Sequence, residues 1–243
     1  MSVVSHGQGS LVAALLKDLA ACATPPGEVI LTLNIAETLP FSEQDFCFPL
    51  VMVRNAARKG FGENHNAAFR RSRGGMFCVL NPDIRLEEDP FPALVSRLQD
   101  LRVGVVAPLI VNPQGEVEDS ARRFPTPLSI LGKALGAKPL AEYEIGSGPV
   151  FPDWVAGMFM VFRREVFEFL GGFDDRYFLY YEDVDLCARL RAAGFRTVLE
   201  PGARAIHQAR RESHRNWRYR AWHLRSMLRF FLRQTLRSGF GHG

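Results

Sequence analysis

The chain has 243 residues, of which 47% are hydrophobic and 23% are charged, so it has the composition of an ordinary globular protein and the length for one large domain, with or without an appendage. Its net charge of +4 is unevenly distributed, because residues 203–243 hold ten arginines and one acid, whereas residues 1–202 hold 20 basic and 25 acidic side chains. The mildly acidic body argues against nucleic-acid binding, and no apolar run reaches the roughly 20 residues that span a bilayer.

Strands and helices are predicted to alternate in the first half of the chain. We expect a helix with Ser10 as its N-cap and with Leu11, Leu15 and Leu19 on one face. The other predicted elements are strands at residues 2–5, 28–34, 49–55, 76–80 and 103–110, and helices at residues 64–72 and 91–101. Because the strands are continuously apolar and alternate with helices, the pattern predicts an α/β domain with a largely parallel sheet and helices on both faces.

The second half is less regular. Residues 153–175, "DWVAGMFMVFRREVFEFLGGFDD", mix strand-like and helical pieces with glycine hinges, after a connection at residues 136–152 that contains glycine and proline. We divide the chain into a nucleotide-fold half (1–110), a second half that completes the site (111–208) and a basic tail (209–243).

The cysteines and the opening residues bear on the compartment. The four cysteines have no paired spacing, which favours reduced thiols over a disulfide framework or a zinc site. The opening "MSVVSHGQGS" lacks the basic and apolar segments of a signal peptide. We therefore expect a cytoplasmic protein.

Polar residues gather where strands are predicted to end, which is where open α/β sheets bind ligands. Asn81 and Asp83 follow the fourth strand in "VLNPDIR"; Asp83 can hold a divalent cation against a diphosphate, although Asn-Pro-Asp is also ordinary turn chemistry. In "NAARKGFGENHNAAF", Gly60 and Gly62 permit close backbone approach before a helix. His65 in the same stretch is interpreted as structural or as a surface residue.

Three carboxylates lie within four positions in "YYEDVDLCARL", namely Glu182, Asp183 and Asp185. Such a cluster resists desolvation, so it needs an explanation. One is structural: acids in a first helical turn favour the helix dipole, and Asp185 has the i,i+4 spacing of an ion pair with Arg189. The other is catalytic.

The chain resembles family 2 glycosyltransferases, and most closely their bacterial rhamnosyltransferase-like branch. The resemblance lies in the order of its motifs, which are "SVVSHG", "LNPDIR", "DWVAGMFMVFRREVF", "GGFDDRYFLYYEDVDLCARLRAAGF" and "IHQ". The resemblance covers residues 2–207. It implies a GT-A fold and an inverting, metal-dependent hexosyl transfer from a nucleotide-sugar, with dTDP-rhamnose as the leading donor, to a glycan or lipid-linked acceptor in surface polysaccharide or lipopolysaccharide synthesis.

The resemblance also implies residue roles. Asp183 matches the catalytic base, with Glu182 beside it. Asp83, the second position of an Asp-x-Asp motif in which Asn81 replaces the first aspartate, matches the ligand of Mg²⁺ or Mn²⁺, and His207 matches a further metal ligand. The donor would contact Ser5, His6, Asn34, Asn55, Gly60, Phe61, Asn66, Asn81 and Asp83. The acceptor would contact Trp154, Gly157 and Asp185, although Trp154 is also an ordinary core residue.

The basic tail predicts an amphipathic helix. One helical stripe is apolar and contains Trp217, Ala221, Leu224, Leu228 and Phe231. The flank of this stripe is basic and contains Arg218, Arg225, Arg229 and Arg233. Such a helix can lie on the anionic inner face of the plasma membrane, or it can pack on the domain or on another subunit in a homo-oligomer. We expect peripheral membrane association.

Two other functions stay open at this level. One is a nucleotidyltransferase on a similar sheet, which the absence of a Gly-rich basic phosphate loop after the first strand disfavours. The other is a non-catalytic module that binds anionic lipid or RNA through the tail, for which steeply salt-dependent binding would be diagnostic.

Overall fold

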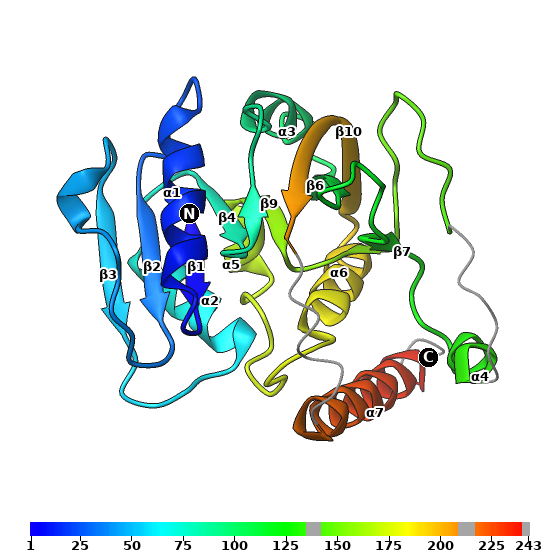
Figure 1. Ribbon diagram of the computed structural model, residues 1–243. Coiled ribbons are helices and arrows are strands. Elements are labelled where there is room, and N and C mark those ends of the chain that lie inside the picture. The colour runs from blue at the N-terminus through cyan, green and yellow to red at the C-terminus, as the bar shows by residue number, and fades with distance from the viewer. Residues whose placement is uncertain (135–141, 209–216, 240–243) are drawn as a thin grey trace.

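The computed structural model describes residues 1–134, 142–208 and 217–239 (Figure 1). The strands are β1 (Ser2–Ser5), β2 (Val29–Leu33), β3 (Leu50–Arg54), β4 (Met76–Leu80), β5 (Ile84–Arg85), β6 (Val103–Val111), β7 (Ala121–Arg122), β8 (Trp154–Val155), β9 (Phe159–Arg163) and β10 (Arg196–His207). The helices are α1 (Gly9–Ala21), the 3-10 helix η1 (Glu43–Asp45), α2 (Phe61–Arg71), α3 (Phe91–Arg97), α4 (Pro127–Ala134), α5 (Arg164–Phe169), α6 (Glu182–Ala192) and α7 (Trp217–Gly239).

One mixed sheet organises the molecule, with the strand order β3-β2-β1-β4-β9-β6-β10-β5. The pairs β3-β2, β2-β1, β1-β4 and β6-β10 are parallel. β9 runs antiparallel to both of its neighbours, β4 and β6, and β5 is antiparallel to β10. β7 and β8 form a separate two-stranded ribbon.

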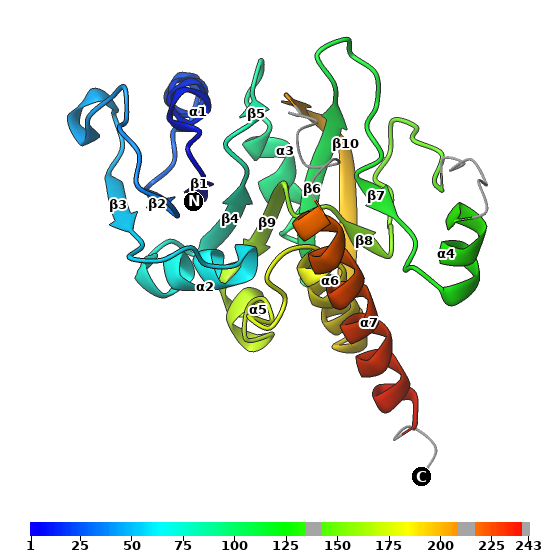
Figure 2. The same cartoon turned by 60° about the horizontal axis from the view of Figure 1, so that its bottom comes forward.

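The core follows from the apolar strands, because every residue of β2 and β6 is buried and both sheet faces therefore need cover. α1 and α3 pack on one face through residues such as Leu15, Leu16 and Leu94. α5 and α6 pack on the other through Phe167, Leu186 and Leu190, and the helices are seen on opposite sides of the sheet in Figure 2. At Gly104 of β6, an added Cβ would lie 2.6 Å from Leu190, so α6 lies directly against the sheet.

The elements predicted in the first half are present, with one correction at α1. Ser10 is not the N-cap: the helix begins at Gly9 after Gln8, and Ser10 is exposed. The turn before it uses Gly7 at φ +78°, in the left-handed region that glycine tolerates. Leu15 and Leu19 are buried as expected, whereas Leu11 is only partly buried.

The antiparallel course of β9 determines where the site forms. The parallel strands β1, β2, β3 and β4 all end at the same edge of the sheet, and β9 begins at that edge because it runs the other way. The residue after β4, Asn81, therefore meets the residue before β9, and its amide donates to the Met158 carbonyl at 2.8 Å. This edge carries most of the polar residues singled out from the sequence.

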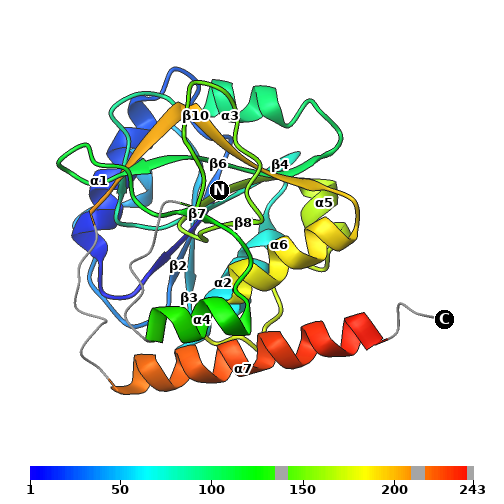
Figure 3. The same cartoon turned by 90° about the vertical axis from the view of Figure 1, so that its right-hand side faces the viewer.

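α7 lies across the side of the molecule that carries α6, with α4 nearby (Figures 1 and 3). It contacts the body through Trp222, Ser226 and Phe230. None of the helices in the described residues is long and apolar enough to cross a bilayer.

Candidate active site

Hydrogen bonds from the side-chain amides of Asn34, Asn55 and Asn64 hold the loop before α2. The buried Asn34 side chain donates to the Lys59 carbonyl at 2.9 Å and accepts from the Lys59 amide at 2.8 Å. The Asn55 amide bridges Asn34 and Asn64, at 2.9 and 2.7 Å. Three asparagines from three elements thus fix the backbone that leads to Gly60 without using charge.

Two residues expected to touch the donor belong to the same support. Ser5 is fully buried, and its hydroxyl accepts the Gln8 amide at 3.1 Å. His6 is half-buried and accepts from Asn34 at 3.1 Å, and burial, followed by the Arg58 charge, lowers its pKa. Next to them, Gly7–Leu11 and Glu37–Pro40 line a hollow of about 390 Å³ at the start of α1.

Asn66 was expected to contact the donor, but in the structure it binds other parts of the protein. Its amide donates to the Phe173 carbonyl at 2.8 Å and to Asp175 at 2.6 Å, and its oxygen accepts the Phe173 amide at 2.9 Å. With only 7% of the residue exposed, it has no group left for a ligand. His65 is structural, as interpreted: it is buried, it is hydrogen-bonded to Ser2 at 2.8 Å, and burial lowers its pKa to about 3.

Asp83 and His207 meet at the carboxyl edge, although 124 positions separate them in the sequence. His207 Nε2 lies 3.3 Å from the Asp83 carboxylate, and its Nδ1 lies 2.7 Å from Glu118. Burial works against protonation of the imidazole, but the two carboxylates outweigh it and raise the pKa of His207 to about 9. Glu118, which lies in the segment after β6, was not predicted from the sequence.

These side chains suit a divalent cation that also contacts a substrate. Among the described residues Asp83 Oδ1 is buried without a hydrogen-bond partner, and Glu118 orients His207 as carboxylates orient metal-binding histidines elsewhere. Within the described ranges no three His, Cys, Asp or Glu side chains form a complete metal site by themselves. Mg²⁺ and Mn²⁺ sites of nucleotide-using enzymes commonly need only one or two protein ligands plus phosphate oxygens, so the donor set fits.

The acidic cluster follows a strained stretch of backbone, which we name the approach segment (Phe178–Tyr181). Tyr180 and Tyr181 both have positive φ, at 71° and 66°, and they are the only non-glycine residues of the described chain that do. A left-handed conformation costs such residues of order 1–3 kcal/mol each, and strain of this kind concentrates at functional sites. α6 begins immediately afterwards, at Glu182.

Asp183 is held at the opening of α6 by backbone donors. Its Oδ2 accepts the Gly157 amide at 3.0 Å and its Oδ1 accepts the Val184 amide at 2.8 Å. A Cβ on Gly157 would lie 3.2 Å from the Phe61 ring and 3.6 Å from Asp183, so a larger residue would press on the Phe61 ring. Because Met158 binds Asn81 and Gly157 binds Asp183, two consecutive residues join the Asn81–Asp83 motif to the acidic cluster.

The two carboxyls that open α6 differ in environment. Glu182 is 5% exposed, and burial together with the neighbouring Asp183 charge raises its pKa well above the ordinary value. Burial also raises the pKa of Asp183, while the Gly157 and Val184 amides oppose the rise. The pKa of both carboxyls is thus raised, but Glu182 is buried whereas Asp183 is partly exposed.

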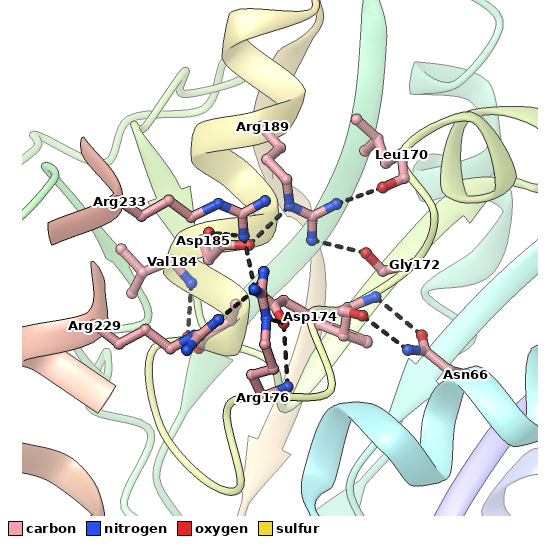
Figure 4. Close-up of polar contacts among 12 residues, drawn as sticks. Asn66, Leu170, Gly172, Asp174, Arg176, Val184, Asp185, Arg189, Arg229 and Arg233 are labelled. Carbon is pink, nitrogen blue, oxygen red and sulfur yellow. Dashed lines mark hydrogen bonds and ion pairs between the residues drawn. The ribbon is translucent and has the colours of Figure 1, made fainter. Parts of the chain in front are cut away.

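Asp185 is a structural ion-pair residue, and its expected contact with an acceptor is corrected here. It is 1% exposed and binds Arg189 at 2.8 Å, as the i,i+4 spacing predicted, and Arg233 of α7 at 2.9 Å (Figure 4). Arg189 in turn donates to the Leu170 and Gly172 carbonyls. Both carboxylate oxygens are occupied, so no acceptor can reach them.

The tail arginines are also corrected in part. Arg233 binds Asp174 at 2.8 Å, and Arg229 lies 3.6 Å from it, so these two face the body and are unavailable to a membrane. Burial opposes ionisation of Asp174, but the neighbouring Arg176 and then Arg229 lower its pKa to about 2. Most of the expected apolar stripe of α7 faces outward, with Trp217 73% exposed, Leu224 52% and Leu228 54%. Phe231 is the exception, because it is partly buried against the body.

Trp154 lies beside the cluster without belonging to the deep core. Its indole nitrogen donates to the Arg123 carbonyl at 2.9 Å, and the Arg122 guanidinium lies 5.5 Å from its ring centroid. Arg122 is also 2.9 Å from Asp119. The residue is half-buried, so part of it is open to solvent.

Comparison with known proteins shows the family of the chain. The family described as glycosyltransferase like family 2 matches residues 1–229. The chain belongs to this family. It is similar to the rhamnosyltransferase WbbL of Escherichia coli, with 33% identity over 74% of this chain and 72% of that protein. It is also similar to N-acetylglucosaminyl-diphospho-decaprenol L-rhamnosyltransferase of Mycobacterium tuberculosis, with 35% identity over 60% of this chain and 50% of that protein.

Solved structures share the fold of this family 2 glycosyltransferase. GalNAc-T7 with UDP, GalNAc and Mn²⁺ superposes with a TM-score of 0.68 at 17% identity, over 87% of this chain and 44% of that one. The mannosyltransferase PcManGT of Pyrobaculum calidifontis, in complex with GDP-Man and Mn²⁺, gives 0.66 at 20% identity, over 96% and 63%. The GT-A fold expected from the sequence is confirmed. This chain spans less than two thirds of each of these two structures and half of the mycobacterial relative.

Proposed function

We propose that this family 2 glycosyltransferase is an inverting, metal-dependent rhamnosyltransferase that uses dTDP-rhamnose and a lipid-linked glycan acceptor in bacterial surface polysaccharide synthesis. The observation that carries the proposal is the Gly157–Met158 junction, which joins the partly exposed Asp183 to the Asn81–Asp83 motif. The donor choice rests on the two rhamnosyltransferase relatives. The acceptor class rests on the name of the mycobacterial relative, which is an N-acetylglucosaminyl-diphospho-decaprenol enzyme.

The chemistry assigned to Asp183 is removal of one proton. The acceptor hydroxyl oxygen attacks the anomeric carbon and forms the new glycosidic bond, the carbon–oxygen bond to the diphosphate breaks, and Asp183 takes the hydroxyl proton. Attack opposite the leaving group inverts the anomeric configuration. Burial raises the pKa of Asp183, which makes its carboxylate a stronger base than an exposed one.

Asp83 and His207 would hold a Mg²⁺ or Mn²⁺ ion, with Glu118 orienting the histidine. When bound, the ion supplies positive charge that stabilises the departing nucleoside diphosphate. We assign the nucleotide to the carboxyl edge, with Asn34 and Asn55 fixing the loop at Gly60 and Phe61, and with the hollow beside Gly7–Leu11 as the place for its base and ribose. The open part of Trp154 and the Gly157 backbone are assigned to the acceptor.

Exchange of the two adjacent carboxyls for their amides tests the base assignment. Asp183→Asn should lower kcat about 10²- to 10⁴-fold, the usual contribution of a general base, with donor affinity retained. Glu182→Gln should cost much less, because burial and the neighbouring Asp183 charge raise the pKa of Glu182 and so favour the uncharged form, which the amide resembles. The readout is dTDP release from dTDP-rhamnose with N-acetylglucosaminyl-diphospho-polyprenol as acceptor. An Asp183→Asn enzyme that retains near wild-type kcat would remove Asp183 from this role.

Thermal shift and calorimetry test the donor and the ion separately. The nucleotide-sugar that binds best raises the melting temperature most, because it stabilises only the folded state; dTDP-rhamnose with Mg²⁺ should exceed UDP- and GDP-sugars. Asp83→Ala should abolish the difference in donor affinity with and without Mn²⁺. Equal dTDP-rhamnose affinity in wild type and Asp83→Ala, at saturating Mn²⁺, would refute the metal assignment.

We place the protein in the cytoplasm, on the inner face of the plasma membrane through the outward stripe of α7. Trp217, Leu224, Leu228 and Leu232 are 52–73% exposed, and Arg218 and Arg225 are exposed beside them. Binding to phosphatidylglycerol vesicles should exceed binding to phosphatidylcholine vesicles, and Leu224→Glu with Leu228→Glu should abolish it. If wild type binds no vesicles but is a dimer in light scattering, and the double variant is a monomer, the stripe instead contacts a second copy of the chain.

A further inference from the structure

α7 contacts the approach segment, which leads into Asp183. Ser226 of α7 donates its hydroxyl to the Leu179 carbonyl at 2.9 Å. Trp222 packs on Phe178 with 4.7 Å between ring centroids, and His223 packs on both Tyr180 and Tyr181 at 5.4 Å. Each residue of the approach segment is therefore touched by α7.

The approach segment is irregular backbone, and its carbonyls are held by three different elements. The Phe178 carbonyl accepts the Phe61 amide at the start of α2, and the Tyr181 carbonyl accepts the Asp185 amide within α6, both at 2.9 Å. The Leu179 carbonyl between them is held by α7. Phe178 also abuts Gly60, where an added Cβ would lie 2.8 Å from its carbonyl oxygen. The segment thus lies between the donor loop and α7, one residue before Glu182.

Ionic contacts fix α7 against α6 close to the same place. Figure 4 shows Arg233 reaching from α7 to Asp185, on the first turn of α6, and to Asp174 on the preceding loop. Phe230, which is 2% exposed, packs on Tyr181 at 5.6 Å. These contacts come from the inward face of α7, opposite the exposed stripe.

We propose that α7 is a positioning element of the active site, which keeps the approach segment in its left-handed conformation and thereby places the Asp183 carboxylate. This inference rests on the base role proposed for Asp183. Two consecutive tyrosines with positive φ persist only where surrounding contacts determine the backbone. Without the Leu179–Ser226 bond and the aromatic packing, the segment relaxes, the first turn of α6 shifts, and the Asp183 carboxylate leaves the Gly157 amide.

A pair of hydroxyl deletions on the same helix tests the proposal. Ser226→Ala removes the bond to Leu179, whereas Thr235→Ala removes a hydroxyl that bonds only to carbonyls of its own helix, at Phe231 and Leu232. Amide hydrogen exchange over residues 178–185 should become faster in Ser226→Ala and stay as in wild type in Thr235→Ala. This readout needs neither donor nor acceptor.

Kinetics should show the same contrast. In dTDP release from dTDP-rhamnose, Ser226→Ala should lower kcat about tenfold, since a shift of roughly 1 Å in a reacting group costs up to about 10²-fold. Its KM for the donor and its calorimetric donor affinity should stay within about twofold of wild type. Arg233→Gln should act in the same direction, with Arg233→Lys recovering part of kcat because it keeps the charge.

The outcomes separate this inference from the proposed function. Unchanged exchange at residues 178–185 together with wild-type kcat in both Ser226→Ala and Arg233→Gln would overturn the positioning role, even if Asp183→Asn is inactive. A parallel fall of kcat, donor affinity and melting temperature would also overturn it, because that is the result of general destabilisation. If Asp183→Asn stays active while exchange rises in Ser226→Ala, the base assignment fails and α7 remains the support of the segment.

Discussion

The two sides of the site are built from different chemistry. On the side proposed to bind the donor, Asn34, Asn55 and Asn64 hold the loop at Lys59 through neutral amide bonds. On the side proposed to hold the base, Asp185, Arg189 and Arg233 fix α6 through ion pairs. The Lys59 loop is thus held by neutral groups, whereas arginines hold the carboxylates of Asp174 and Asp185 in place beside α6.

Arg189→Met should give the largest loss of stability, because it leaves Asp185 with one cation and frees the Leu170 and Gly172 carbonyls. Removal of one partner from a buried ion pair costs about 3–5 kcal/mol, measurable as the free energy of unfolding in urea. Adding Asp185→Leu to the same chain should restore part of that loss. A decrease below about 1 kcal/mol would mean that the network behaves as a surface pair.

Asn34→Ala should have the next largest effect, since Asn34 is 2% exposed and its amide serves two groups of Lys59 as well as His6 and Asn55. Buried groups left without partners cost about 1–3 kcal/mol, and the same urea titration measures it. The matched control is Gln99→Ala, which removes an exposed amide and should change stability little. If both variants lower the free energy of unfolding equally, the asparagine hydrogen bonds at Lys59 do not stabilise the fold.

The ion pairs of Asp174 should make the stability of the protein depend on pH. Neighbouring arginines outweigh burial and lower its pKa to about 2, below the ordinary value of about 4, so its contribution to stability is present above pH 4 and is lost as the pH falls towards 2. The difference in melting temperature between wild type and Asp174→Asn should therefore be largest near pH 6 and shrink below pH 4. A difference that grows on acidification would contradict the ion-pair assignment.

Lys59→Ala should have the smallest effect. Its ammonium lies 2.9 Å from Glu63, but both side chains are more than a third exposed, and such i,i+4 pairs contribute about 0.3–0.5 kcal/mol. The donor loop is held through the Lys59 backbone rather than through its charge. A loss of stability comparable to that of Asn34→Ala would show that charge matters on this side too.

The sequence predicted the elements better than the contacts between them. Continuously apolar runs located β2, β4 and β6, and the family resemblance pointed to Asp83, Asp183 and His207. The contact of His207 with Glu118 joins residues 89 positions apart, a separation at which periodicity carries no information. The left-handed tyrosines were equally invisible, because nothing in the residue type of tyrosine favours positive φ.

The tail shows where pattern reasoning reaches its limit. The apolar stripe of Trp217, Leu224 and Leu228 was correctly placed on one helical face, but a helical pattern cannot tell which face meets the body. α7 docks instead through its Trp222, Ser226 and Phe230 side. The sequence placed Arg233 on the basic flank but could not show its partners, because Asp174 and Asp185 are 59 and 48 positions away.

The course of β9 has a consequence for how such an enzyme can open and close. β9 comes from the later half of the chain, yet it is hydrogen-bonded to β4 on one side and to β6 on the other. A rigid-body hinge between the two halves of the chain would have to break the hydrogen bonds between strands in the middle of one sheet. Substrate entry and product departure must therefore be accommodated by loops at the carboxyl edge, with the sheet itself as the fixed frame.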